Sequence, residues 1–228
     1  MQINNKYNNK EIMIQKSIKY KSGLLIVTLL CSISVFGQIS LTKIDMTKLP
    51  KEINYEGKIN NAIRWTDNLG DNIVITSETG IYKSKKFKHE SDGSDAELFA
   101  YHFIIKKDSI KQTWKVYDFI QDCIVDIEAS FIKNTFRVTD LNKDGVAEIW
   151  LMYKTACHGD ISPCDMKIVM YQGQQKYAMR GQNKVQVSEN EFYGGDYKFD
   201  KAFTDGPNEF REFAKKLWDK NIMQKWGE

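Results

Sequence analysis

The sequence has little proline and little histidine, and it lacks the short motifs that mark common catalytic sites. Three prolines and three histidines occur among its 228 residues. It contains no glycine-rich phosphate loop, no serine nucleophile elbow and no His-Glu-x-x-His zinc motif. No linker rich in proline, glycine or serine divides residues 38–228, which are therefore predicted to form a single domain.

A long apolar run is also missing, because the longest one, from Leu24 to Phe36, is shorter than the roughly 20 residues of a membrane span. It follows a polar segment with five lysines, so residues 1–37 are predicted to be a secretory signal peptide cleaved after Gly37. Translation from Met13 would give a more ordinary basic segment. Lipidation of Cys31 is disfavoured, because apolar sequence continues after it. The mature protein is expected in the periplasm or outside the cell, without a transmembrane span.

Neither sign of charge dominates once residues 1–37 are removed. These residues carry five lysines and one glutamate, so 28 basic and 29 acidic side chains remain. A nucleic-acid-binding domain normally presents a basic face. The only basic cluster, Lys83–Lys88, is more typical of a solvated strand end, and no nucleic-acid partner is expected.

Short segments in which apolar and polar residues alternate are abundant, and this is the spacing of half-buried strands. Most breaks between them are short, which favours antiparallel connections. The predicted fold is therefore mainly β, with antiparallel meander sheets arranged as a sandwich or a partial propeller. The predicted strands are Glu52–Ile59, Ala62–Thr66, Asn72–Thr76, Ile81–Lys86, Glu97–Lys106, Lys111–Phe119, Cys123–Phe131, Thr135–Thr139, Ala147–Lys154, Lys167–Tyr171, Gln175–Arg180 and Tyr197–Phe199.

The tail of the chain has helical spacing instead. Pro207 is placed to begin a helix that is predicted to run to about residue 225. Its acidic residues lie early and its lysines late, as the helix dipole favours. The face predicted to pack on a sheet carries Phe210, Phe213, Ala214, Leu217 and Asn221.

One stretch, Asp140–Glu148, concentrates the oxygen atoms that calcium prefers. Its acidic and amide residues alternate, so their side chains can converge on one point. Gly145 stands where such loops turn sharply. The candidate ligands of a structural Ca2+ are Asp140, Asn142, Asp144, Val146 through its carbonyl group, and Glu148.

The flanks of this loop favour a hairpin over an EF-hand. Apolar residues alternate on both sides, and Leu151 stands where an EF-hand has its bidentate glutamate. The loop resembles the Asp-x-Asp-x-Asp-Gly-x-x-Asp loops of FG-GAP repeats in integrin-type β-propellers, with Asn142 and Glu148 as departures. The alternative is a polar hairpin turn that binds no metal. A weaker echo, Ile63–Asp67, resembles Phe136–Asp140 and is either a degenerate repeat or a chance similarity.

Three cysteines follow the predicted signal peptide, and export permits a disulfide among them. Spacing leaves the pairing of Cys123, Cys157 and Cys164 open. A Cys157–Cys164 bond would close a small loop, whereas a Cys123–Cys157 bond would tie two strands together. The second pairing is slightly favoured because both cysteines lie at ends of predicted strands, and it would leave Cys164 as a free thiol.

Few other residues point to catalysis. Cys157 and His158 are neighbours, but adjacent side chains at a strand end point in different directions, so they are not expected to form a catalytic dyad. His102 lies in an aromatic segment and is predicted to be packed. No catalytic residue is assigned. The tryptophans expected in the core are Trp65, Trp114 and Trp150.

Five short motifs in the second half of the chain carry a family resemblance: Thr139–Glu148, Tyr153–Cys157, Gly159–Pro163, Lys176–Gly181 and Gly194–Tyr197. In this order they resemble a small bacterial exported family that is labelled surface polysaccharide biosynthesis protein. The resemblance implies a process at the cell envelope and no defined reaction, and it supplies no catalytic residues.

Three functions remain open at this point. The first is a non-catalytic exported domain, stabilised by calcium, that associates with the cell envelope or its surface polysaccharide. The second is a periplasmic glycan-processing enzyme that uses paired carboxylates such as Asp160, Asp165 and Asp196. The third is a protein-binding or inhibitor module that presents the Cys157–Cys164 loop. The lack of catalytic motifs favours the first.

Overall fold

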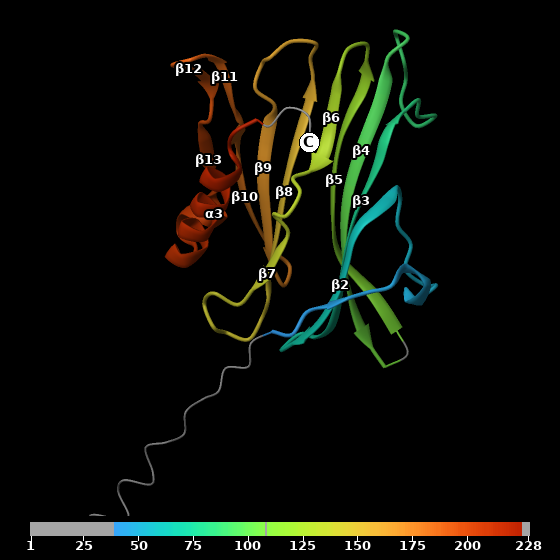
Figure 1. The fold of residues 1–228 in the computed structure, drawn as a ribbon. Coiled ribbons are helices and arrows are strands. Elements are labelled where there is room, and N and C mark those ends of the chain that lie inside the picture. The colour runs from blue at the N-terminus through green and yellow to red at the C-terminus, as the bar shows by residue number, and fades with distance from the viewer. Residues whose placement is uncertain (1–38, 108, 225–228) are drawn as a thin grey trace, which may run out of the picture. The chain divides into compact units, whose positions relative to one another are not determined.

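The computed structural model describes residues 39–107 and 109–224, and the predicted signal peptide lies outside these residues. Two antiparallel sheets face each other, so the predicted β fold is confirmed and takes the sandwich form (Figure 1). The first sheet has the order β1-β2-β3-β4-β5 and the second β13-β10-β9-β8-β6, with β7 also paired to β8, while β11 and β12 form a separate hairpin. The strands are β1 (Thr42–Lys43), β2 (Lys58–Asp67), β3 (Gly70–Tyr82), β4 (Ser94–Lys106), β5 (Ser109–Cys123), β6 (Ile127–Phe131), β7 (Arg137–Thr139), β8 (Glu148–Cys157), β9 (Asp165–Gln172), β10 (Gln175–Gln182), β11 (Lys184–Ser188), β12 (Glu191–Gly194) and β13 (Tyr197–Phe199).

The main core lies between the two sheets, because alternate side chains of the facing strands point inward. Trp65 and Trp114 of the first sheet pack there against Leu151 and Tyr171 of the second. The third predicted core tryptophan, Trp150, is also buried but points to the outer side of the second sheet, beneath the helices. All three tryptophans therefore stabilise the fold and are not free to bind a ligand.

Two helices cover the outer face of the second sheet, α2 (Lys201–Asp205) and α3 (Asn208–Asn221) (Figure 1). The predicted C-terminal helix is α3, but it ends earlier than predicted. Lys184 at the start of β11 donates its backbone N–H to the carbonyl of Ile222 at 2.7 Å, so the backbone after α3 pairs with a strand. Of the predicted face, Phe210, Ala214 and Leu217 are buried, while Phe213 and Asn221 are half-buried.

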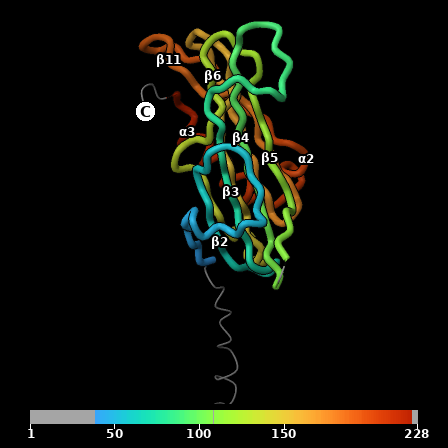
Figure 2. Tube along the Cα trace, turned by 90° about the vertical axis from the view of Figure 1, so that its right-hand side faces the viewer, coloured from blue at the N-terminus to red at the C-terminus, as the bar shows by residue number. Residues whose placement is uncertain are grey.

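The outer face of the first sheet is covered by residues 44–57, which cross it in Figure 2. Ile44 and Ile53 of this segment pack near Phe99 and Tyr101 of β4. Both faces of β3 and β4 are thus buried in their central parts, which explains why these two strands contain long continuous apolar runs.

Several predicted strand boundaries are wrong, and β-bulges are the main reason. A break was predicted at Asn60-Asn61, but β2 continues through it with a shift in its register to β3. The strand predicted to begin at Ile81 is the end of β3, which passes a second register shift after Glu78. The predicted strand Cys123–Phe131 is divided by a turn between β5 and β6, and residues 52–57 form no strand.

His102 is packed in the main core, as predicted, between the rings of Trp65 and Trp114 at centroid distances of 5.5 and 5.2 Å. Its Nε2 contacts Oδ1 of Asn72 at 3.1 Å, and its Nδ1 contacts the Thr113 hydroxyl at 2.6 Å. Burial lowers the pKa of His102 to about 4, and the charge of a nearby aspartate opposes this only in part. The imidazole is therefore neutral in the folded protein at neutral pH.

Because the imidazole of His102 is buried and neutral, we expect the folded protein to lose stability in acid. The unfolded chain protonates His102 near pH 6.5 but the folded protein only near pH 4, so between these values the unfolded state binds more protons. Stability rises with pH in this window and is lost as the pH falls. Relative to a His102→Gln variant, the free energy of unfolding should drop by about 1 kcal/mol between pH 6 and pH 5. Equal pH slopes in urea titrations of the two proteins would contradict the prediction.

Candidate functional site

The Asp140–Glu148 loop connects β7 to β8, which pair with each other in antiparallel register. The predicted hairpin flanks are therefore confirmed. The loop rests on the β2–β3 turn of the first sheet. Asn68 donates its backbone N–H to the carbonyl of Gly145 at 2.8 Å and its side-chain amide to the carbonyl of Asp144 at 2.9 Å. Ala147 N donates to the carboxylate of Asp67 at 3.1 Å, so the last residue of the echo Ile63–Asp67 lies against this loop.

Glu148 forms the buried floor of the loop. Its carboxylate accepts hydrogen bonds from the Thr139 hydroxyl at 2.7 Å and from Leu141 N at 2.9 Å. Burial raises the pKa of Glu148, and the charge of Asp140 contributes to the rise. Two carboxylates therefore lie close enough to repel each other at this point. One oxygen of Asp140, Oδ1, is buried and has no hydrogen-bond partner among the described residues, while Oδ2 accepts from Gly145 N at 3.2 Å.

The other side chains of the loop are turned toward one another. The Asn142 amide donates to Asp144 Oδ2 at 2.9 Å, and Val146 N donates to Asp144 Oδ1 at 2.8 Å. Within the described ranges, no three His, Cys, Asp or Glu side chains gather closely enough to hold a metal ion by themselves. A calcium site in this loop would therefore depend on the Asn142 amide and the Val146 carbonyl as well as on the carboxylates, and it stays a prediction.

Gly145 is the residue that allows the loop to lie on the β2–β3 turn. Its φ is +77°, and a Cβ at this position would lie 2.2 Å from the side-chain nitrogen of Asn68. Gly80 has a similar φ of +70°, but a Cβ added there would meet nothing within 4 Å, so it offers a matched comparison.

Gly145→Ala should destabilise the protein more than Gly80→Ala does. Both changes force an L-residue into left-handed backbone, which costs about 1–2 kcal/mol. Only Gly145→Ala also displaces Asn68 and its hydrogen bond to the loop, which should add about 1 kcal/mol. The free energy of unfolding of both variants in urea checks this. Equal losses would show that the contact with Asn68 contributes nothing.

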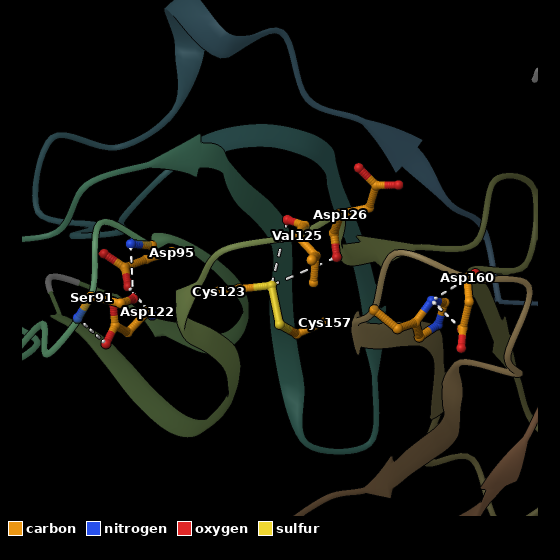
Figure 3. Close-up of a disulfide and its surroundings, with 10 residues drawn as sticks. Ser91, Asp95, Asp122, Cys123, Val125, Asp126, Cys157 and Asp160 are labelled. Atoms are coloured by element: carbon orange, nitrogen blue, oxygen red, sulfur yellow. Dashed lines mark hydrogen bonds and ion pairs between the residues drawn. A yellow bond between two sulfur atoms is a disulfide. The ribbon is translucent and has the colours of Figure 1, made fainter.

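A disulfide joins Cys123 at the end of β5 to Cys157 at the end of β8, with Cα atoms 5.8 Å apart (Figure 3). It confirms the pairing that strand ends favoured, and it links the first sheet to the second. The loop of Asp140–Glu148 precedes β8 and the disulfide follows it. The two sheets are therefore connected at both ends of β8, by hydrogen bonds at one end and by a covalent bond at the other.

Of the three cysteines that the structure describes, Cys164 is the free one, as predicted, and it is buried. Its Sγ lies 3.7 Å from Nε2 of His158. Burial raises the pKa of the Cys164 thiol, which keeps it protonated and unreactive. Since Cys157 is held in the disulfide, neither cysteine can serve His158 as a nucleophile in this state. The loop between Cys157 and Cys164 exposes Ile161 at its surface.

The predicted carboxylate candidates are only partly brought together. Asp165 and Asp196 line one shallow depression of about 310 Å³, in which Lys167 and Arg180 also lie. Asp160 does not line it, and its side chain caps the backbone of Ser162 instead. The depression is small and open, and its three cationic side chains, those of Lys167, Arg180 and Lys198, outnumber its two acids.

A larger site was missed by the sequence analysis. A groove of about 720 Å³ lies at the open edge of the sandwich, and we call it the polar groove. It is bordered by β2 and β3 of the first sheet, by β6, β7 and β8 of the second, and by the end of α3. Its polar and charged lining residues are Asn60, Asn61, Thr76, Glu78, Glu128, Ser130, Lys133, Asn134, Thr135, Arg137, Lys154, Asn183, Lys220, Asn221 and Gln224.

Local features of the chain shape this groove. The bulge in β2 lets the consecutive residues Asn60 and Asn61 both line it, although neighbours in a regular strand point to opposite faces. Among the described strands β6 pairs only with β8, so its other edge is free. Glu78 reaches across from β3 and accepts a hydrogen bond from Phe131 N on that edge at 2.6 Å. Glu78 therefore bridges the two sheets at the groove, whose lining also includes the amides of Asn60 and Asn61.

Two carboxylates of the polar groove differ in their surroundings. Burial raises the pKa of Glu78, while the charge of Glu128 adds to the rise and hydrogen bonds oppose it. Glu128 accepts a hydrogen bond from Ser130 and lies 3.8 Å from Nζ of Lys154. Lys154 also donates to the side chain of Gln224 at 3.1 Å. The lining thus contains hydrogen-bond donors, acceptors and both signs of charge in fixed positions.

None of the described helices combines the length and the apolar composition that a membrane crossing needs. The Asp140–Glu148 loop, the disulfide and the polar groove are the features from which a function can be argued. The chain matches no protein-family model, no curated protein and no solved structure.

Proposed function

We propose that this protein is an exported, non-catalytic β-sandwich that binds a cell-surface polysaccharide in the polar groove. The observation that carries the proposal is the lining of the groove by amide, hydroxyl and charged side chains. Sugars present many hydroxyl groups, each of which can donate and accept hydrogen bonds. Amide side chains can donate to them and accept from them, and carboxylates can accept from two neighbouring hydroxyl groups. The resemblance to a surface polysaccharide family supports the same class of ligand. A disulfide is typical of oxidising compartments, which supports export.

Calcium is the second part of this proposal. The loop would hold a Ca2+ ion through Asp140, Asn142, Asp144, the Val146 carbonyl and Glu148. The unpartnered buried oxygen of Asp140 and its proximity to Glu148 support this assignment, because a cation would satisfy the first and relieve the repulsion. The ion would fix the loop on the first sheet. Since Arg137 on β7 lies just before the loop and lines the groove, the same ion would stabilise one groove wall.

Retention of the purified protein on immobilised polysaccharides tests the proposed binding. A panel of bacterial capsular polysaccharides and lipopolysaccharide O-chains should include at least one that the protein binds. Asn60→Trp, which places a large ring at the bulge in the groove mouth, should abolish that retention. Gln112→Trp places the same ring on an exposed position of β5 outside the groove and should leave it unchanged. Retention that survives Asn60→Trp would move the binding site elsewhere.

A second candidate function, glycan cleavage, is favoured by the carboxylate pair in the groove. Glu78, with its raised pKa, has the environment of a general acid, and Glu128, which lies 3.8 Å from Nζ of Lys154, would be the second carboxylate of the pair. Cleavage would release new reducing ends from a bound polysaccharide, and Glu78→Gln would stop the release while binding persists. Binding without any release of reducing ends would leave the non-catalytic function alone.

A further inference from the structure

We infer that the polar groove selects acidic oligosaccharides, with the carboxylates of uronate residues bound by Lys133, Arg137 and Lys220. This inference rests on the proposed function and names the ligand class. The groove is lined by four cationic side chains and two carboxylates, so its charge is unbalanced. A neutral glycan would gain nothing from this excess.

The cations of the groove fall into two groups. Lys154 is half-buried at the base, where Glu128 lies 3.8 Å away and Gln224 accepts its hydrogen bond. Lys133, Arg137 and Lys220 are exposed, and none of them has an ion-pair partner among the described carboxylates. The charge at the base is therefore compensated within the protein, and the charge at the rim is available to a ligand.

Three separate segments bring the rim cations to one groove. Lys133 lies in the β6–β7 loop, Arg137 on β7, and Lys220 in the last turn of α3. The β6–β7 loop is fixed, because the buried Thr135 hydroxyl donates to the carbonyl of Ile132 at 2.6 Å and Asn134 adopts a left-handed φ of +59°. Arg137 uses one guanidinium nitrogen on the carbonyl of Phe136 and keeps its other donors, which suit a carboxylate.

The base of the groove complements the sugar hydroxyls of such a ligand. Asn183 is buried; its oxygen accepts from Cys164 N at 2.7 Å, and one of its two amide hydrogens is donated to Gln224, which leaves the other for a ligand. Asn61 donates to the Thr76 hydroxyl at 3.0 Å and keeps its carbonyl oxygen for other partners. The amides at the base of the groove and the cations at its rim together favour an oligosaccharide that carries both hydroxyl groups and carboxylates.

A matched pair of probes tests the inference, a short oligogalacturonate and its fully methyl-esterified form, titrated into the protein by calorimetry. The ester keeps the sugar chain and its hydroxyl groups, but each carboxyl group loses its charge and gains a methyl group. The ester should bind roughly tenfold or more weakly, and Lys133→Gln and Arg137→Gln should each weaken binding of the acid about fivefold. Lys111→Gln, an exposed lysine on β5 outside the groove, should change nothing. Raising the salt concentration should weaken binding of the acid and leave that of the ester unchanged.

The outcomes separate this inference from the proposed function. Equal affinity for acid and ester, or no effect of the two rim variants, would overturn the charge selection and leave polysaccharide binding in place. Retention of neutral polysaccharides alone in the panel would do the same. Retention of no polysaccharide at all would overturn the proposed function and this inference together.

Discussion

Removing the Cys123–Cys157 disulfide is expected to lower the free energy of unfolding by about 3–4 kcal/mol. The bond closes a loop across a sequence separation of 34 residues, so it restricts the unfolded chain substantially. It also joins the two sheets at the end of β8 that lies far from the Asp140–Glu148 loop. Urea unfolding of the double variant Cys123→Ala/Cys157→Ala, compared with the native protein, measures the effect.

Two controls make the disulfide experiment specific. Native protein treated with a reducing agent should unfold at the same urea concentration as the double variant, since both lack the same bond. Cys164→Ala removes the one free buried thiol among the described residues and should cost much less, because it breaks no covalent link. A loss below about 1 kcal/mol in the double variant would contradict the stabilising role of the bond.

Calcium should raise the free energy of unfolding by about 2.7 kcal/mol when present at a hundredfold excess over its dissociation constant. The proposed ligands exist as a set only in the folded loop, so the ion binds the native state alone. Magnesium should stabilise less, because it demands a more rigid octahedral geometry than this loop of mixed side-chain and carbonyl oxygens offers. Thermal or urea unfolding with calcium, with magnesium and with chelator provides the measurement.

Isosteric variants separate metal binding from loop structure. Asp140→Asn and Asp144→Asn keep the side-chain shape but remove a charge, so each should abolish most of the calcium effect. Asp126→Asn, an exposed position in the β5–β6 turn, should retain all of it. Identical unfolding curves with calcium and with chelator would show that Asp140–Glu148 is a hydrogen-bonded turn only.

Features encoded by local sequence were predictable, and the Asp140–Glu148 loop is the clearest example. The alternating apolar residues around it placed it between two paired strands, and this is where it lies. The Cys123–Cys157 pairing could be favoured because strand ends are visible in the sequence. The calcium assignment is different, because it depends on how five oxygen-bearing groups converge, and spacing alone does not fix that.

The polar groove could not be predicted, because its lining comes from segments between Asn60 and Gln224 that share no local pattern. One feature of the sequence pointed to the groove but was interpreted as a break between two strands. The pair Asn60-Asn61 interrupts the alternation of apolar and polar residues in β2. A β-bulge and a break between strands interrupt this alternation in the same way, so the sequence does not distinguish them. Helix α2 was missed because five residues do not establish a helical period. The early end of α3 depends on its pairing with β11, which is a tertiary contact.

The two sheets are built from consecutive parts of the chain, and this determines the order in which the molecule can assemble. The five strands of the first sheet end at Cys123, and those of the second begin at Ile127. Because no strand crosses from one sheet to the other among the residues described, the first sheet can complete its backbone pairing during synthesis, before any residue of the second has emerged. Its inner apolar face stays uncovered until then. In that order of assembly the late event would be the docking of two finished layers, and the thiol of Cys123 would meet its partner only in that docking.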